Sequence, residues 1–256
     1  MPLEIRADNQ GPVFEKMEDG IIALDPGVRT FMTGYSTEGE AIEWGKNDFG
    51  RIYRLCHALD KLQSKWNQND VRHRKRYKMR RAAMRIRKKI RNLINDAHRK
   101  LATLLVENFR IVLIPLFETQ KMSKRSSRRI GKKSVRAMLT WGHYRFRQRL
   151  LNKTREYPWC NVFVVDEAYT SKTCGKCGIL HQTLGSSKTF KCPKCSVEMD
   201  RDINAARNIF LRYLTNNMRA SSKGLALGPT PFEEKSKMQD SDQVYSEMDR
   251  LDQVLL

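Results

Sequence analysis

Hydrophobic residues in the first part of the chain are grouped in short runs that predict β-strands. A continuous apolar run at 21–24 ends at the turn-forming tripeptide Asp-Pro-Gly at 25–27, which is typical of a buried strand. Segments 29–35 and 41–44 are two further strand candidates, separated from their neighbours by glycine-containing turns. We therefore expect an antiparallel meander at the start of the folded domain.

A long helical stretch follows. Residues 48–108 contain no proline and a single glycine, Gly50, and their apolar positions recur at helical spacing. The pattern predicts two long helices, at about 48–70 and 72–108.

The second of these helices is strongly basic. Twelve of the twenty residues from Arg72 to Arg91 are Lys or Arg. The face is either simply solvated or bound to phosphate, and phosphate is favoured because such a run without acids repels itself. The run also has the composition of a nuclear localisation signal. The predicted nucleic-acid contacts are Arg72, Arg74, Lys75, Arg76, Lys78, Arg80, Arg81, Arg85, Arg87 and Lys88.

The second half mixes strand and helix signals. Apolar runs at 110–115 and 161–165 predict buried strands, and 135–152 and 203–214 predict amphipathic helices. The polar, basic stretch 121–133 predicts a mobile loop. Polar composition at both ends predicts a partly ordered lead-in at 1–19 and a disordered tail at 215–256.

The charge of the chain indicates a polyanionic partner. In 256 residues, 49 Lys and Arg against 28 Asp and Glu give a formal net charge of +21. Such an excess produces a surface potential that attracts nucleic acid. No apolar run approaches the roughly 20 residues of a membrane span, and the N-terminus lacks the apolar core of a signal peptide. We expect an intracellular protein with no membrane partner, in the nucleus of a eukaryotic or virus-infected host and otherwise in the cytoplasm.

Four of the six cysteines form two Cys-x-x-Cys pairs. Cys174 and Cys177 are separated from Cys192 and Cys195 by fourteen residues, and glycine and proline in and around the pairs favour tight turns. Two such pairs can surround one Zn²⁺ tetrahedrally, and a closed site of this kind is structural. Free thiols or a redox pair are the alternatives. The spacing therefore predicts a zinc ribbon at 170–199.

Three carboxylates lie where a metal-dependent nuclease requires them. Asp25 ends the first buried strand, Glu167 follows the strand at 161–165, and Asp202 opens the last helix. Acids at such positions are also common caps and turn residues. Two-metal phosphodiester hydrolysis needs carboxylates that converge from separate elements on Mg²⁺ or Mn²⁺.

Three stretches resemble a known family. ALDPGVRTF at 23–31, IVLIPLFETQKM at 111–122 and the cysteine-rich block at 167–209 are similar to the RuvC-like nuclease domain of TnpB proteins, and more closely to Fanzor. The resemblance implies an α/β, RNase H-like mixed sheet with flanking helices. In this chain the RuvC-like nuclease domain would comprise 20–169 and 200–214. Residues 48–108 would be a basic helical segment within it, and the zinc ribbon at 170–199 would be inserted between its two parts.

The resemblance also assigns catalytic positions. Asp25 matches the family's first catalytic aspartate, and Asp202 matches the last one. Most TnpB proteins carry a glutamate where this chain has Pro115. Fanzor-like members use another glutamate, which Glu167 matches, and Glu118 is the rival. Structural Zn²⁺ and catalytic Mg²⁺ or Mn²⁺ are the implied cofactors.

The implied function is a transposon-associated, RNA-guided DNA endonuclease that uses two divalent ions. Its implied partners are DNA, a guide RNA and a separate protein supplying the family's large N-terminal portion, because only some twenty residues precede the first strand. The alternative is a non-catalytic zinc-ribbon nucleic-acid-binding protein derived from a decayed or truncated nuclease.

Overall fold

The structure, a computed structural model, describes residues 20–222 apart from positions 47, 125, 127–129, 167 and 186. The predicted lead-in at 1–19 and the chain beyond 222 lie outside the described residues. Glu167, the predicted middle carboxylate, also lies outside them.

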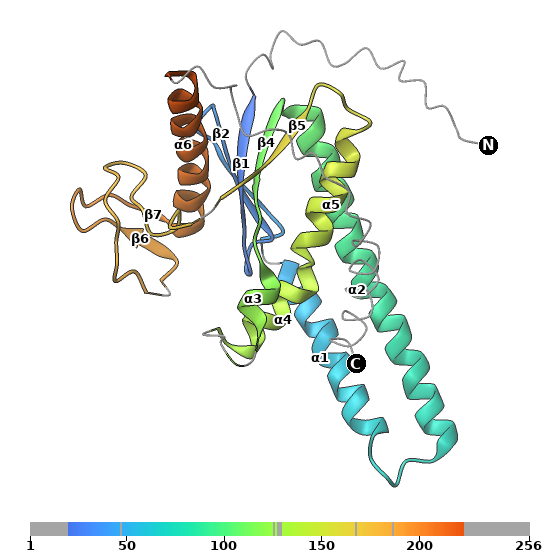
Figure 1. The fold of residues 1–256 in the computed structure, drawn as a ribbon. Coiled ribbons are helices and arrows are strands. Elements are labelled where there is room, and N and C mark those ends of the chain that lie inside the picture. The colour runs from blue at the N-terminus through green and yellow to red at the C-terminus, as the bar shows by residue number, and fades with distance from the viewer. Residues whose placement is uncertain are drawn as a thin grey trace.

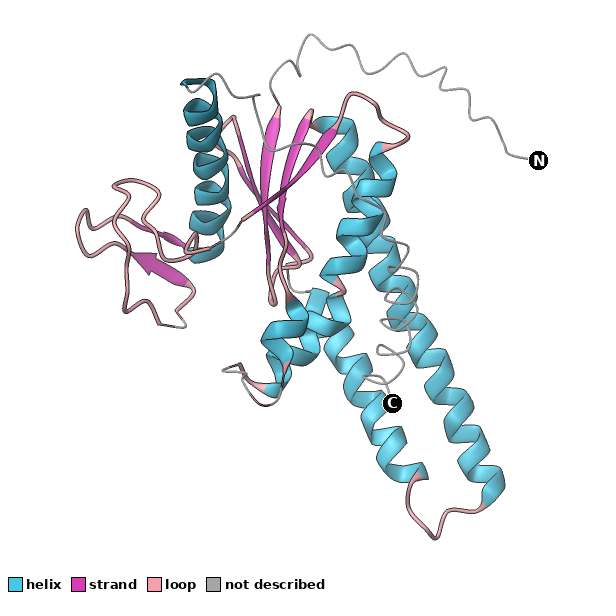
Figure 2. Cartoon of the chain, viewed as in Figure 1, coloured by secondary structure: helices cyan, strands magenta, loops and turns pink. Residues whose placement is uncertain are grey.

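A mixed five-stranded sheet forms the centre of the fold (Figures 1 and 2). Its strand order is β3-β2-β1-β4-β5, with β1 paired antiparallel to β2 and parallel to β4. The antiparallel meander predicted for the first three strands is confirmed. The strands are β1 (Ile21–Pro26), β2 (Met32–Ser36), β3 (Ala41–Trp44), β4 (Ile111–Pro115) and β5 (Asn161–Val165).

Helices cover both faces of this sheet. In Figure 1, α6 lies on one side of it, and α2 and α5 lie together on the other. A separate two-stranded hairpin of β6 and β7 lies beside the start of α6. The remaining elements are α1 (Asp48–Trp66), α2 (His73–Asn108), α3 (Thr119–Ser123), α4 (Lys132–Trp141), α5 (His143–Thr154), β6 (Thr189–Lys191), β7 (Glu198–Asp200) and α6 (Arg201–Ser222).

Successive residues of β1 separate the core into two layers. Ile22 and Leu24 are fully buried in the large cluster that α2 and α5 help to form, whereas Ala23 packs with Ile209 and Tyr213 of α6. Adjacent strand residues point to opposite faces, so this alternation also shows which face each remaining side chain of β1 points to. The side chain of Asp25 therefore lies on the α6 side.

Three predictions about the helices were wrong in detail. The helix expected at 135–152 is two helices, because Gly142 has a left-handed φ of 62° and ends α4 before α5 begins. The expected loop 121–133 contains the end of α3 and the start of α4. The last helix continues to Ser222, beyond the predicted end at 214, so the first residues of the predicted tail are helical.

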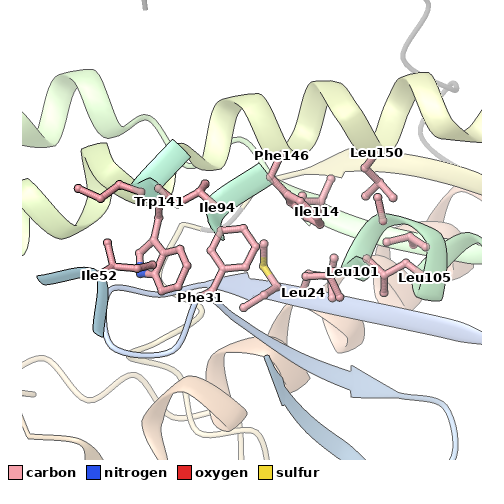
Figure 3. Packing of buried hydrophobic residues seen from close by; sticks show 14 of the residues in the cluster. Leu24, Phe31, Ile52, Ile94, Leu101, Leu105, Ile114, Trp141, Phe146 and Leu150 are labelled. Atoms are coloured by element: carbon pink, nitrogen blue, oxygen red, sulfur yellow. The ribbon is translucent and has the colours of Figure 1, made fainter. Parts of the chain in front are cut away.

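Phe31 forms the centre of the large core cluster (Figure 3). Its ring stacks on His98 and His143, with ring centroids 5.0 and 5.1 Å apart, and contacts Trp141 at 4.9 Å. His98 Nε2–H donates to the carbonyl oxygen of Trp141 (2.9 Å). This aromatic cluster holds the β1–β2 turn that follows Asp25.

Both histidines of this cluster make stability depend on pH. Burial lowers the pKa of His143 to about 3, and burial with the nearby Arg145 and Arg149 charges lowers that of His98 to about 3. The unfolded chain takes up these protons near pH 6.5, so stability is complete above that pH and is lost as pH falls towards 3. At pH 5 each histidine should lower the free energy of unfolding by about 2 kcal/mol.

Thermal unfolding of His143→Phe should show a weaker pH dependence between pH 7 and 5 than the parent. An equal pH dependence of the two proteins would contradict this account.

Candidate functional site

The four predicted cysteines come together in one cluster. The sulfur atoms of Cys174 and Cys195 are 3.6 Å apart, as are those of Cys177 and Cys192, and all four lie within 4.8 Å of one another. A tetrahedron with Zn–S distances of about 2.3 Å has edges of about 3.8 Å. The thiol donors and their spacing therefore fit one zinc ion.

Local backbone geometry builds this cluster. Gly178 and Ser196 have left-handed φ values of 73° and 55°, which turn the chain after each cysteine pair. The N–H groups of Lys194 and Cys195 donate to the Cys192 sulfur, both at 3.4 Å. Burial raises the pKa of the Cys192 thiol, but these N–H groups together with the neighbouring thiols of Cys195 and Cys177 lower it to about 6. The turn thus favours the thiolate that a metal requires.

Two asparagines of α6 attach the first cysteine pair to the helix. Asn204, fully buried, accepts from the Gly175 N–H (3.1 Å) and donates to the Thr173 carbonyl (2.8 Å). Asn208 donates to the carbonyls of Thr173 (2.6 Å) and Thr170 (2.8 Å). Nothing in the helical pattern indicates these contacts, and Asn208 was not predicted from the sequence. The hydrogen bonds of these two asparagines attach the ribbon to the start of α6, where Asp202 lies.

Asp25 and Asp202 are brought to the same side of the sheet by different elements. Asp25 is in register with Thr33 of β2, and Thr33 is in register with Glu43 of β3, so all three lie on the α6 side. Asp202 is in the first turn of α6, and its N–H donates to the Asp200 carboxylate (2.9 Å).

The turn after Asp25 requires glycine. A Cβ on Gly27 would lie 2.5 Å from the Thr30 carbonyl oxygen, and the Gly27 N–H donates to the Phe31 carbonyl (3.2 Å). Phe31 is itself buried in the aromatic cluster. The Asp-Pro-Gly motif thus places Asp25 at the end of a rigid strand.

Asp202 lies in an acid-rich, half-buried environment. Burial raises its pKa, and the negative charges of Asp200 and Glu43 raise it further, against the opposing charges of Arg201 and Lys188. Glu43 is ion-paired with Lys46, and Lys188 lies 3.4 Å from Asp200. A divalent cation would relieve the repulsion among these carboxylates, so the residues present fit such an ion. Glu43 was not predicted from the sequence, because its place in the same cross-strand row as Asp25, two strands away, depends on strand register.

The third carboxylate is not fixed by the described geometry. No three carboxylate, histidine or cysteine ligand atoms other than the cysteine sulfurs lie within 4.8 Å of one another in the described residues. Glu118 precedes α3 as its N-cap residue, beyond Pro115. Asp166 is engaged elsewhere, because its carboxylate pairs with Arg212 of α6 (2.7 Å). The choice of Glu167 stays a prediction.

The predicted basic residues lie along the first half of α2, apart from Arg72, which precedes the helix as its N-cap residue. Eight of the ten are exposed, and Arg76 and Arg87 are partly buried. Tyr77 and Met84 are also exposed, by 56% and 63%, and Arg81 lies over the Tyr77 ring. Arg76 has a structural contact, since it donates to the Gln68 carbonyl (3.1 Å) across the α1–α2 turn.

Within the described residues, no helix combines the length and apolar character of a membrane span.

Comparisons with known proteins show what this chain is similar to. Residues 143–209 match the family model described as Cas12f1-like, TNB domain. The chain is 33% identical over 203 residues to a protein named as a putative transposase of Paramecium bursaria Chlorella virus 1, covering 78% of this chain and 45% of the relative. It is 30% identical over 201 residues to a TnpB-like protein of Acanthamoeba polyphaga mimivirus, covering 75% and 37%.

A bacterial relative and a solved structure extend the comparison. The chain is 27% identical over 206 residues to the "Putative RNA-guided DNA endonuclease InsQ" of Escherichia coli strain K12, covering 74% of this chain and 48% of the relative. It superposes on Cas12f1 from a cryo-EM complex with sgRNA and target DNA with a TM-score of 0.52 and 22% identity, covering 74% of this chain and 49% of the other. The chain spans less than half the length of these relatives.

The mixed sheet and the match to Cas12f1 agree with the predicted RuvC-like fold, and the cysteine cluster fits a zinc ion. The chain is TnpB-like, as the sequence motifs predicted. The closer likeness to Fanzor stays a prediction.

Proposed function

We propose that this chain is the catalytic part of an RNA-guided DNA endonuclease that depends on divalent metal. The observation that carries the proposal is the placement of Asp25 and Asp202 on the α6 side of the sheet. The names of TnpB-like, InsQ and Cas12f1 relatives support the substrate, DNA, and the guide RNA.

In this proposal Asp25 and Asp202 hold Mg²⁺ or Mn²⁺ together with a glutamate, Glu167 in our assignment. The bound ions would activate the attacking water and stabilise the leaving oxygen. Asp25 contributes a half-buried carboxylate directly after the fully buried residues Ile22, Ala23 and Leu24 of β1. Asp202 contributes one that is partly desolvated and surrounded by acids, which strengthens its attraction for a cation. Lys46 and Lys188 add positive charge that attracts a DNA phosphate.

The zinc ribbon has a structural role in the same proposal. Zn²⁺ would hold Cys174, Cys177, Cys192 and Cys195, and the Asn204 contacts would transmit that order to the first turn of α6. The basic residues of α2 would contact phosphates. The separate protein expected to supply recognition stays a prediction. The basic run supports a nuclear location in a eukaryotic or virus-infected host.

Cleavage of a mixed DNA pool tests this function. Protein purified with its co-purifying RNA should cut DNA in Mg²⁺ or Mn²⁺ and should stop cutting when EDTA is added. Pretreatment with RNase should remove the activity if RNA guides it. Cutting that continues in EDTA would contradict the metal-dependent proposal.

The alternative is a non-catalytic nucleic-acid-binding protein. Pro115 favours it, because it ends β4 where most TnpB proteins place a catalytic glutamate. Such a binder should hold DNA or RNA with no requirement for divalent metal and should never cut. A Mg²⁺ titration of both binding and cleavage therefore separates the two functions.

The middle carboxylate is tested by two matched variants. Glu167→Gln should abolish cleavage, because it removes a metal ligand while keeping the side-chain size, and Glu118→Gln should cut like the parent. Initial rates of DNA cleavage at saturating Mg²⁺ make the comparison. Full activity of Glu167→Gln with loss in Glu118→Gln would show that our assignment is wrong.

A further inference from the structure

Residues of α2 and α5 line a basic groove. Both helices lie on the side of the sheet opposite α6 (Figure 1). The volume of the groove is about 570 Å³, enough to receive a phosphate together with its sugar. Four cationic side chains line it, with Arg99 from α2 and Arg145, Arg149 and Lys153 from α5. The groove is separate from the basic residues predicted at 72–88 and from the candidate nuclease site.

Cationic side chains outnumber carboxylates among the residues that line this groove. Arg149 donates to the backbone carbonyl of Asn95 (3.1 Å) and to its side-chain oxygen (3.3 Å), and both acceptors are neutral. Burial and the charge of Arg99 lower the pKa of Arg149. Glu156, the carboxylate among the lining residues, is bound to Lys153 (2.6 Å). Arg99 and Arg149 thus offer guanidinium N–H groups to an anion on the groove surface.

The lining favours the backbone of a nucleic acid. Guanidinium groups donate two parallel hydrogen bonds to phosphate oxygens. Thr103, Gln148 and Asn152 add neutral donors and acceptors between the cations. Such groups match a 2′-hydroxyl, which both donates and accepts. These features together favour RNA over DNA.

We propose that the α2–α5 groove binds the sugar-phosphate backbone of an RNA strand that is held and not cut. The carboxylates lie on the other side of the sheet, so a strand in this groove does not pass through the nuclease site. The inference rests on the proposed function only in that an RNA accompanies the enzyme.

The test is RNA binding by the double variant Arg99→Gln/Arg149→Gln. Fluorescence anisotropy should follow an RNA hairpin and a DNA hairpin of the same sequence over a range of salt concentrations. We expect about tenfold weaker RNA binding and a salt slope smaller by roughly one or two. The DNA hairpin should lose less affinity than the RNA.

A matched control is the double variant Lys100→Gln/Lys191→Gln, which loses the same charge. Both lysines are exposed and paired with carboxylates, at 2.9 Å from Asp96 and 3.8 Å from Glu198. It should bind RNA within about twofold of the parent. Equal losses in both double variants, parent-like RNA binding by the groove variant, or an equal loss for DNA and RNA would each overturn the proposal.

Folding and catalysis are separated from the groove in the same experiment. If Arg149→Gln lowers the melting temperature, Arg99→Lys/Arg149→Lys keeps the charge and should show weaker RNA binding with an unchanged salt slope. All binding is measured without divalent metal, so a chain that does not cut still gives an answer. Normal cleavage together with parent-like RNA binding by the groove variant would overturn the proposed RNA binding by the α2–α5 groove. The proposed nuclease function would still stand.

Discussion

Asp25→Asn is expected to lower the rate of DNA cleavage by about a thousandfold or more, since the loss of a metal-binding charge costs several kcal/mol of transition-state stabilisation. The amide has the size of the carboxylate, so the end of β1 and its turn should remain folded. DNA binding should be unchanged, because the basic residues of α2 carry it. Cleavage rates in Mg²⁺ and anisotropy with the same DNA measure the two effects.

Asp166→Asn is the matched control for this prediction. Asp166 follows β5 and is exposed, and its carboxylate is held by Arg212 and the Ala168 N–H. The variant should cut within a few-fold of the parent. Equal losses in Asp25→Asn and Asp166→Asn would indicate a general effect of acid removal and would contradict a specific role for Asp25.

Cys192→Ser is expected to remove zinc and to unfold the ribbon. Structural zinc supplies about 10–16 kcal/mol in small zinc modules, which is more than the short β6–β7 hairpin can replace. The start of α6 would lose the contacts of Asn204 and Asn208, and cleavage should fall with it. Metal analysis of the purified protein and limited proteolysis of 170–199 measure the loss.

Cys160→Ala is the control for the ribbon. Cys160 is buried in the main core, where burial raises the pKa of its thiol to about 12, and it lies outside the cysteine cluster. This variant should keep one zinc per chain and a protected ribbon, with a modest loss of stability from the cavity. A Cys192→Ser protein that retains both zinc and proteolytic protection would show that the site is not a four-cysteine zinc centre.

Much of the fold follows from local patterns. The runs at 21–24 and 110–115 are apolar because both faces of the central strands β1 and β4 are covered, and the run at 161–165 forms the edge strand β5. The long helices were predictable because Asp48 to Asn108 lacks proline. Gly142 was not recognised as a break, since its left-handed φ depends on the packing of α4 and α5, which helical periodicity does not show.

The candidate site was predictable only in part. Cys-x-x-Cys spacing is a local signal, so the cluster could be found from the sequence. Glu43 and Asn208 act through partners that lie far away along the chain, across the sheet and in the ribbon. Arg76 resembles its basic neighbours in sequence, yet its contact with Gln68 is structural. Contacts of this kind depend on register and helix packing, which a single sequence does not give.

The most direct test of the account compares Asp25→Asn, Asp202→Asn and the double variant with the parent, in Mn²⁺ binding and in DNA cleavage. If both carboxylates hold the same metal centre, each single variant should lose cleavage and tight Mn²⁺ binding, and the double variant should be no worse than either. Cleavage at the parental rate by either single variant would contradict the account.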